Sequence, residues 1–133
     1  MIDCIFCKIL NNEIPSTKLY EDEGVYAFLD IRPISKGHAL VVPKRHSETF
    51  LDMASEDIDS LFKTTQKVAT AVMEAMNADG FNIGMANFPA AGQSVPHSHV
   101  HIIPRFSDDG LKHWSGGESN DLEEIQKKIV KFL

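Results

Sequence analysis

Apolar residues recur at three- and four-residue spacing through a long central stretch of the chain, residues 55–77. The repeating positions are Ile58, Leu61, Phe62, Val68, Ala69, Val72, Met73 and Met76. This spacing predicts one long amphipathic helix that packs its apolar face on the core. We expect Ser55 to cap the start of this helix and the stop signal in residues 77–80 to end it.

Shorter segments rich in β-branched and aromatic residues favour strands. The expected strands cover residues 25–29, 38–42, 81–86 and 100–103, and a second helical spacing predicts a terminal helix over residues 121–132. A turn signal at residues 35–37 makes the first two strands a pair. No repeat or linker interrupts the pattern. It therefore predicts a single α+β domain over residues 1–133, an antiparallel β-sheet with a long central helix and a C-terminal helix.

Charge and hydropathy narrow the function classes. The 133 residues carry 13 lysines and arginines against 19 aspartates and glutamates, a formal net charge of −6. Proteins that bind nucleic acid or membrane surfaces non-specifically attract phosphates by positive charge, so we expect no DNA, RNA or membrane partner. No apolar run approaches the ~20 residues that span a bilayer, and the first residues lack a signal-peptide pattern. We expect a cytoplasmic protein.

Three of the six histidines fall at alternate positions, His97, His99 and His101. Alternate side chains of a strand share a face, so we expect a strand to align all three rings. Packing explains such a cluster poorly, because each buried imidazole needs its own hydrogen-bond partner. The rings could ligate a metal, or one could act as a nucleophile or base that its neighbours orient. The residues alone leave both uses open.

Gly92, Gln93 and Ser94 come shortly before the histidines. Backbone N–H groups around a glycine can bind an anion without any net positive charge, and amide and hydroxyl side chains add hydrogen bonds. This stretch therefore predicts a phosphate-binding loop beside the histidine cluster.

Cys4 and Cys7 are the only cysteines. In a cytoplasmic chain such a pair is either a redox pair or half of a tetrahedral metal site. The redox alternative needs a βαβ context, which the first residues do not provide, so the spacing favours Zn²⁺. The spacing does not identify the other two ligands.

Residues 92–105 closely resemble the signature of the histidine triad (HIT) superfamily. Residues 3–9 with 13–15, 27–31 and 37–46 extend the similarity in the same order, and Lys112-His113-Trp114 resembles the C-terminal region of the small nucleoside-phosphoramidase branch. Two departures stand out. Ser98 replaces a usual apolar residue, and Phe88-Pro89 replaces a loop rich in glycine or aspartate.

The resemblance implies that His99 attacks the α-phosphorus of a nucleotide and forms a nucleotidyl-histidine intermediate that water hydrolyses. His101 and the phosphate loop would surround the phosphate, and His38 would support the histidine cluster. The positions implied for the nucleotide are Asp30 for the ribose, Ile5, Phe6, Ile14, Phe28 and Ile31 for the base, and Asn87, Gly92, Gln93 and Ser94 for the phosphate. The ligands implied for a structural Zn²⁺ are Cys4, Cys7, His46 and His97.

The function that this resemblance implies is hydrolysis of purine nucleoside phosphoramidates of the adenosine type by a homodimer whose sheet extends across two subunits. Three alternatives remain open at this point. The chain could hydrolyse dinucleoside polyphosphates, it could be a zinc-stabilised nucleotide-binding scaffold without turnover, or His97, His99 and His101 could hold a catalytic zinc.

Overall fold

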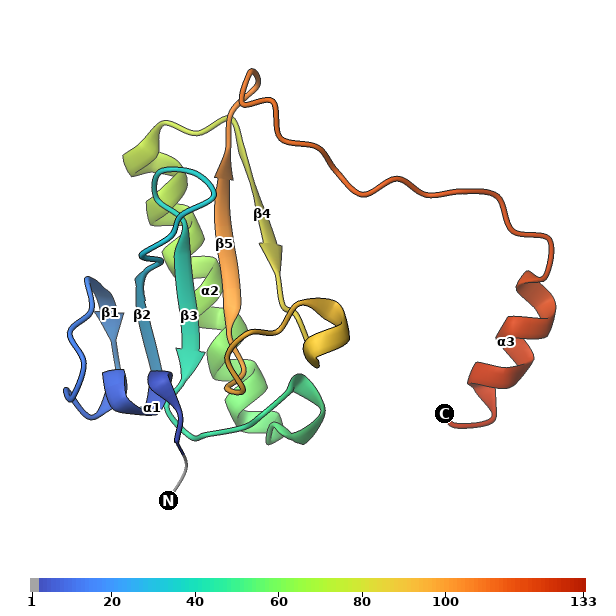
Figure 1. Ribbon diagram of the computed structural model, residues 1–133, viewed down its shortest axis with the longest axis horizontal. Coiled ribbons are helices and arrows are strands. Elements are labelled where there is room, and N and C mark those ends of the chain that lie inside the picture. Colours follow the sequence, from blue (N-terminus) through green and yellow to red (C-terminus); the bar gives the residue numbers. More distant parts are fainter. Residues whose placement is uncertain (1–2) are drawn as a thin grey trace.

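A five-stranded antiparallel sheet forms the body of the protein in the computed structural model, which describes residues 3–133 (Figure 1). Its strand order is β1-β2-β3-β5-β4, and every pairing in this sheet is antiparallel. The strands are β1 (Lys18–Glu21), β2 (Val25–Leu29), β3 (Ala39–Pro43), β4 (Gly80–Gly84) and β5 (Val100–Arg105). The α+β class predicted from the sequence is confirmed.

Apolar side chains cover both faces of the neighbouring inner strands β2 and β3, which is why these segments read as almost unbroken apolar runs. Against one face lies the long helix α2 (Ser55–Met76), and against the other the short helix α1 (Ile5–Leu10). The core beneath α2 contains Val25, Ala27, Ala39, Val41, Leu61, Val68, Ala69, Val72, Val100 and Ile102. The core beneath α1 contains Cys4, Phe6, Ile9, Tyr26, Phe28, Leu40 and Val42.

The predicted elements are present with shifted ends; one strand was missed and two expectations were wrong. Strand β1 was missed, because it is short and mostly exposed at the sheet edge. Ser55 is the first helical residue of α2 and not its cap; Ala54 holds the N-cap position, without a side-chain hydrogen bond. His97 and His99 lie before β5, which begins at Val100, so only His101 of the three is in the sheet.

The last segment of the chain leaves the body. Residues 111–133 are all exposed, and α3 (Leu122–Val130) stands apart from the sheet at the end of an extended stretch (Figure 1). Within residues 3–133, no helix combines the length and the hydropathy that crossing a bilayer requires.

Candidate functional site

Three histidine rings converge where β3 and β5 pair. His101 lies on β5 opposite Leu40 of β3, His38 immediately precedes β3, and His99 immediately precedes β5. The ring centroids of His99 and His101 are 4.9 Å apart, and those of His101 and His38 are 5.1 Å apart. The fold therefore lines up one imidazole on β5 with two others at the starts of β3 and β5.

Backbone hydrogen bonds assign the protons on His38 and His101. The N–H of Ile34 donates to Nδ1 of His38 at 3.1 Å, so the hydrogen of the neutral His38 ring sits on Nε2. That Nε2 lies 2.9 Å from Nδ1 of His101, which must accept. The remaining nitrogen of His101, Nε2, therefore carries a hydrogen and is a donor.

His99 carries its hydrogen on the other ring nitrogen, Nδ1. Its Nδ1 lies 2.7 Å from the carbonyl oxygen of His97, and because a carbonyl only accepts, Nδ1 must carry the hydrogen. Nε2 of His99 is left with a free lone pair. The ring of Phe6 packs edge-on against the ring of His99, with the two ring centroids 5.0 Å apart, and this contact holds the orientation of His99. An unprotonated nitrogen thus stands beside the N–H donor of His101.

Burial keeps this group uncharged. Desolvation lowers the pKa of His99 and of His38, and it lowers the pKa of His101 to about 4, with His99 and His38 adding to the effect. The carboxylate of Asp30 opposes the shift, since its Oδ2 lies 3.6 Å from Nε2 of His38. Near neutral pH the three rings are neutral, as a nucleophilic imidazole requires.

The predicted phosphate loop follows the short turn η2 (Pro89–Ala91), and Gly92 has a positive φ of 94° there. Gln93 does not extend a free amide: its Nε2 donates to the carbonyls of Glu48 and Val95, at 2.6 and 3.1 Å. Asn87 is also engaged, because its Oδ1 accepts from the N–H of Phe50 at 2.7 Å. Ser94 is exposed. Gln93 and Asn87 therefore shape the loop through their side-chain oxygens and amides.

The positions implied for the nucleoside divide into two groups. Phe6 and Phe28 are buried, with ring centroids 5.6 Å apart, and Ile14 packs against the same core. Ile5 and Ile31 face outward, 49% and 90% exposed. Ile5 is exposed because α1 buries Phe6 and Ile9, which point to another side of the helix. The structure brings Phe6 to His97 and His99, buries Phe28 behind Phe6, and leaves Ile5 and Ile31 on the surface.

Asp30 follows β2 directly and is partly buried. Its Oδ1 accepts the N–H of Arg32 at 2.8 Å, which fixes the carboxylate near the end of the strand. The other oxygen faces His38. Asp30 is thus held close to the histidine cluster, at the same end of β2 as Phe28.

Four side chains from three separate segments lie close enough together to hold a metal ion: Cys4, Cys7, His46 and His97. The His46 and His97 Nδ1 atoms are 3.1 Å apart, and the nitrogen–sulfur distances are 3.4 to 3.6 Å. A tetrahedron with ordinary zinc bond lengths has edges of roughly 3.3 Å between nitrogens and roughly 3.6 Å between nitrogen and sulfur. The donor atoms are therefore spaced as a tetrahedral ion requires.

The protonation pattern of this group also suits a cation. Nε2 of the fully buried His97 lies 2.8 Å from the Pro43 carbonyl and donates to it, so Nδ1 turns a lone pair toward the thiols. Burial lowers the pKa of His97 to about 4 and raises that of Cys7 to about 11. A bound cation would offset this shift, because metal coordination favours the thiolate form. The geometry and the donor set fit a metal ion, and His99 is not among its ligands.

Backbone groups account for most of what sequence reasoning missed. The carbonyls of His97 and Pro43 and the N–H of Ile34 set the histidine tautomers, and any residue type supplies such groups. The contact between Phe6 and His99 was also missed, although the apolar character of Phe6 pointed to burial.

The chain is similar over most of its length to known proteins. The HIT domain family model matches residues 11–108. An uncharacterised HIT-like protein of Methanocaldococcus jannaschii is 48% identical over 127 residues, which cover 95% of this chain and 98% of the relative. The adenosine 5′-monophosphoramidase of Saccharomyces cerevisiae is 42% identical over 131 residues, 98% of this chain and 80% of the relative.

Solved structures agree with the fold. A crystal structure of a HIT family protein from Bacillus subtilis superposes with a TM-score of 0.90 at 41% identity, covering 99% of this chain and 98% of that one. A zinc-bound histidine triad family protein from Mycobacterium smegmatis superposes with a TM-score of 0.79 at 32% identity, covering 98% of each chain.

Proposed function

The chain belongs to the HIT domain family, and on that basis we propose that it hydrolyses purine nucleoside phosphoramidates of the adenosine type at the α-phosphorus. One observation carries the proposal. Nδ1 of His99 is tied to the carbonyl of His97, so the Nε2 lone pair is free beside the N–H donor of His101. The yeast relative named as an adenosine 5′-monophosphoramidase supports the choice of substrate.

In the first step, Nε2 of His99 attacks the α-phosphorus and the bond from phosphorus to the leaving nitrogen breaks. The departing amine takes a proton from water. The His99 ring, now bonded through Nε2 and still protonated at Nδ1, carries positive charge, which the His97 carbonyl at 2.7 Å stabilises. His101 donates from Nε2 to a phosphoryl oxygen, where charge develops.

In the second step, water attacks the phosphorus and the bond to His99 breaks. A nucleoside monophosphate leaves, the proton of the attacking water passes to solvent, and neutral His99 returns. Splitting one displacement into two is the advantage of covalent catalysis. His38 acts through His101, because its Nε2–H fixes the tautomer that lets His101 donate.

The remaining positions would hold the substrate. In this proposal Asp30 accepts the ribose hydroxyls, Phe6, Phe28 and Ile14 back the base, and the exposed Ile5 and Ile31 close over it from the rim. Gly92 and Ser94 contact the phosphate, and Asn87 and Gln93 fix the loop that carries them.

Replacing His99 tests the reaction. We expect His99→Ala to lower kcat for adenosine phosphoramidate by more than about a thousandfold, because the nucleophile is lost, while the affinity for AMP changes less than about threefold. Chromatography of released AMP and calorimetry of AMP binding measure the two effects. His113→Ala, an exposed histidine of the C-terminal segment, is the matched control.

Three outcomes separate the alternatives. Retained turnover in the His99→Ala protein would refute the nucleophile. AMP binding by a wild-type protein that gives no product and no nucleotidyl adduct on rapid quenching would favour the scaffold. A higher kcat/KM for a dinucleoside polyphosphate than for the phosphoramidate would favour the polyphosphate hydrolase.

We further propose that Cys4, Cys7, His46 and His97 hold a structural Zn²⁺. Four protein ligands leave no open position for substrate, which is typical of structural zinc. The ion would link Cys4 and Cys7, at the start of α1, to His97 in the segment before β5. His97 links the two sites, since its ring faces the metal group and its carbonyl orients His99.

Removing the metal tests this role. We expect Cys7→Ser to abolish stoichiometric zinc and to lower the Tm by more than about 10 °C, because metal binding contributes to folding free energy. Atomic emission and circular dichroism measure both. If chelation removes activity and leaves the Tm unchanged, the zinc is catalytic and the structural assignment is wrong.

We also propose a cytoplasmic homodimer. Cys4 and Cys7 form no disulfide, which suits a reducing compartment. The strand β4 ends the sheet, and the groove beside it is lined by apolar side chains such as Phe62, Met73 and Ile83.

Residues 111–133 form about a sixth of the chain, so the TM-score of 0.90 with the Bacillus subtilis structure requires the C-terminal segment to leave the body along a similar course there. A segment that extends in the same way in a related protein is suited to contact a second subunit.

A further inference from the structure

Phe88 has a backbone conformation that side chains rarely adopt. Its φ is 71° and its ψ is 153°, in a region that only glycine enters at low cost. Burial does not explain a phenylalanine at this position, because 52% of the residue is exposed. Strained residues of this kind concentrate at ligand-binding sites, where the surrounding structure holds them in place.

The loop around Phe88 is held by a closed set of hydrogen bonds. Its N–H donates to Oε1 of Gln93 at 2.8 Å, and its carbonyl accepts the N–H groups of Ala91 and Gln93 at 3.0 and 3.2 Å. Gln93 in turn donates to the carbonyl of Glu48. The residue that anchors Phe88 thus lies next to Ser94 in the predicted phosphate loop.

A cavity of about 280 Å³ lies between Phe88, which precedes η2, and Thr49, which precedes the turn η1 (Phe50–Asp52). Its lining consists of Glu48, Thr49, Phe88, Pro89, Gln93, Ser94 and Pro96. One aromatic ring and two prolines make much of this lining apolar, and Glu48 adds a carboxylate. The cavity shares Gln93 and Ser94 with the phosphate loop, so it adjoins the place proposed for the phosphorus.

The sheet order shows which part of a substrate reaches this cavity. The proposed nucleoside residues Phe28 and Asp30 belong to β2 and its end, whereas the Phe88 loop follows β4 at the other side of the sheet. His99 and His101 lie between them, at β5. A nucleotide whose base lies near β2 and whose phosphorus lies at His99 leaves only its departing group to occupy the Phe88 side.

We propose that Phe88 contacts the departing amine and gives the enzyme a preference for phosphoramidates whose leaving amine carries an aromatic ring. The inference rests on the proposed phosphoramidase function. A flat apolar ring at the cavity wall stabilises an aromatic leaving group by contact and stacking, and it offers nothing to ammonia. Phe88 is on this account a specificity residue, and the nucleophile and the phosphate donors do not depend on it.

Two adenosine phosphoramidates test this role, one with ammonia and one with tryptamine as the leaving amine. We expect Phe88→Ala to raise KM for the tryptamine compound about tenfold with kcat nearly unchanged, since a ground-state contact is lost. For the ammonia compound both constants stay within about twofold. Phe88→Tyr, which keeps an aromatic ring, retains the preference.

Backbone strain is separated from ring contact by two further variants. Phe88→Ala keeps the Cβ atom and therefore the backbone strain, whereas Phe88→Gly removes both the strain and the ring. We expect the two variants to lose the same selectivity, and we expect the glycine variant to have the higher Tm. Leu51→Ala, at an exposed apolar residue of η1 outside the cavity lining, is the control and keeps the wild-type ratio.

The outcomes distinguish this inference from the proposed function. If the wild-type protein turns over both compounds and Phe88→Ala leaves their kcat/KM ratio unchanged, the role of Phe88 is wrong and the phosphoramidase activity stands. If the wild-type protein turns over neither compound, both proposals are overturned.

Discussion

At the scale of single residues, backbone groups determine which histidine nitrogens carry protons. The N–H of Ile34 and the carbonyl of His97 lie at the two ends of the row, and each leaves its ring a single neutral tautomer. As a result His99 presents a lone pair and His101 presents an N–H. The lone pair of His99 would be lost on protonation, so burial that keeps this ring neutral serves the proposed chemistry directly.

The same burial predicts acid sensitivity. Burial lowers the pKa of His101 from 6.5 to about 4, so between these values the unfolded chain binds a proton that the folded chain does not. Stability should therefore fall as the pH decreases from 6.5 toward 4. We expect His101→Gln to reduce the loss of Tm across this window by several degrees.

Thermal melts of zinc-saturated protein measure this effect. The metal ligands are the same in both proteins, so the difference between the two melts isolates His101. His113→Gln, at an exposed histidine, should melt like the wild type. A wild-type Tm that does not change across the window would contradict the account.

At the scale of elements, the start of α2 shows how one position decides a helix end. The N–H groups of Asp57 and Ile58 both donate to the carbonyl of Ala54 at 3.0 Å, which makes Ala54 the N-cap. Alanine has no side-chain oxygen to accept the free N–H groups of the first turn. The hydroxyl of Ser55 is one position too late for this role.

Ala54→Ser should stabilise the protein by about 1 kcal/mol and raise the Tm by about 3–5 °C, because the serine oxygen can accept a first-turn N–H. Denaturant unfolding measures the change. Ser55→Ala is the matched control, and it should alter the free energy of unfolding by less than about 0.5 kcal/mol. If Ser55→Ala destabilises the protein by as much as the loss of an N-cap does, the assignment of Ala54 as the N-cap is wrong.

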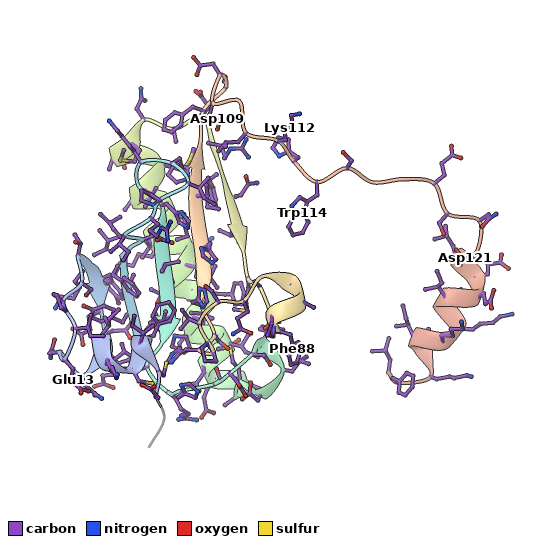
Figure 2. All side chains as sticks on the ribbon, viewed as in Figure 1. Glu13, Phe88, Asp109, Lys112, Trp114 and Asp121 are labelled. Carbon is purple, nitrogen blue, oxygen red and sulfur yellow. The ribbon has the colours of Figure 1, made fainter. Side chains whose placement is uncertain are left out.

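At the scale of the whole molecule, hydrogen bonds of Arg105 fix the point at which the C-terminal segment leaves the sheet. Nε of Arg105 donates to Asp109 at 2.8 Å, and Nη2 donates to the carbonyl of Leu111 at 2.9 Å, where the segment departs. Figure 2 shows Trp114 on the stretch from Lys112 to Asp121, with α3 standing apart beyond it. An exposed apolar stripe runs along α3 and just beyond it, and its members are Leu122, Ile125, Ile129 and Phe132. Exposed apolar residues grouped in this way favour a protein partner.

Charging this stripe tests the proposed homodimer. We expect Ile125→Lys with Ile129→Lys to weaken the dimer by more than about tenfold, because the helix loses its apolar contact with the second subunit. Sedimentation velocity measures the change. Lys127→Ser with Lys131→Ser, on the opposite face of the segment, is the control. A wild-type protein that stays monomeric at high concentration would exclude the homodimer, and an unchanged dimer in the lysine variant would exclude α3 from the interface.

Much of the fold could be predicted because its elements follow short-range rules. The spacing of Leu61, Val68 and Val72 indicated α2 without any knowledge of what they pack against, and the apolar runs indicated β2 and β3. The placement of His97 and His99 on a strand was wrong for the same reason. Alternation predicts a strand, but pairing with β3 and β4 decides where β5 begins.

By itself, the sequence determined the helices, most strands, the histidine cluster, the cysteine pair and the family resemblance, because each depends on neighbouring residues. The family resemblance implied His46 and His97 as partners of Cys4 and Cys7, and the tertiary structure shows that the four side chains meet. Only the tertiary structure decided that Phe6 supports His99, that Ile5 and Ile31 face outward, and that Phe88 borders a cavity. These facts depend on contacts between distant segments and on backbone N–H and C=O groups. Every residue carries such backbone groups, proline without the N–H, so no residue pattern records where they bind.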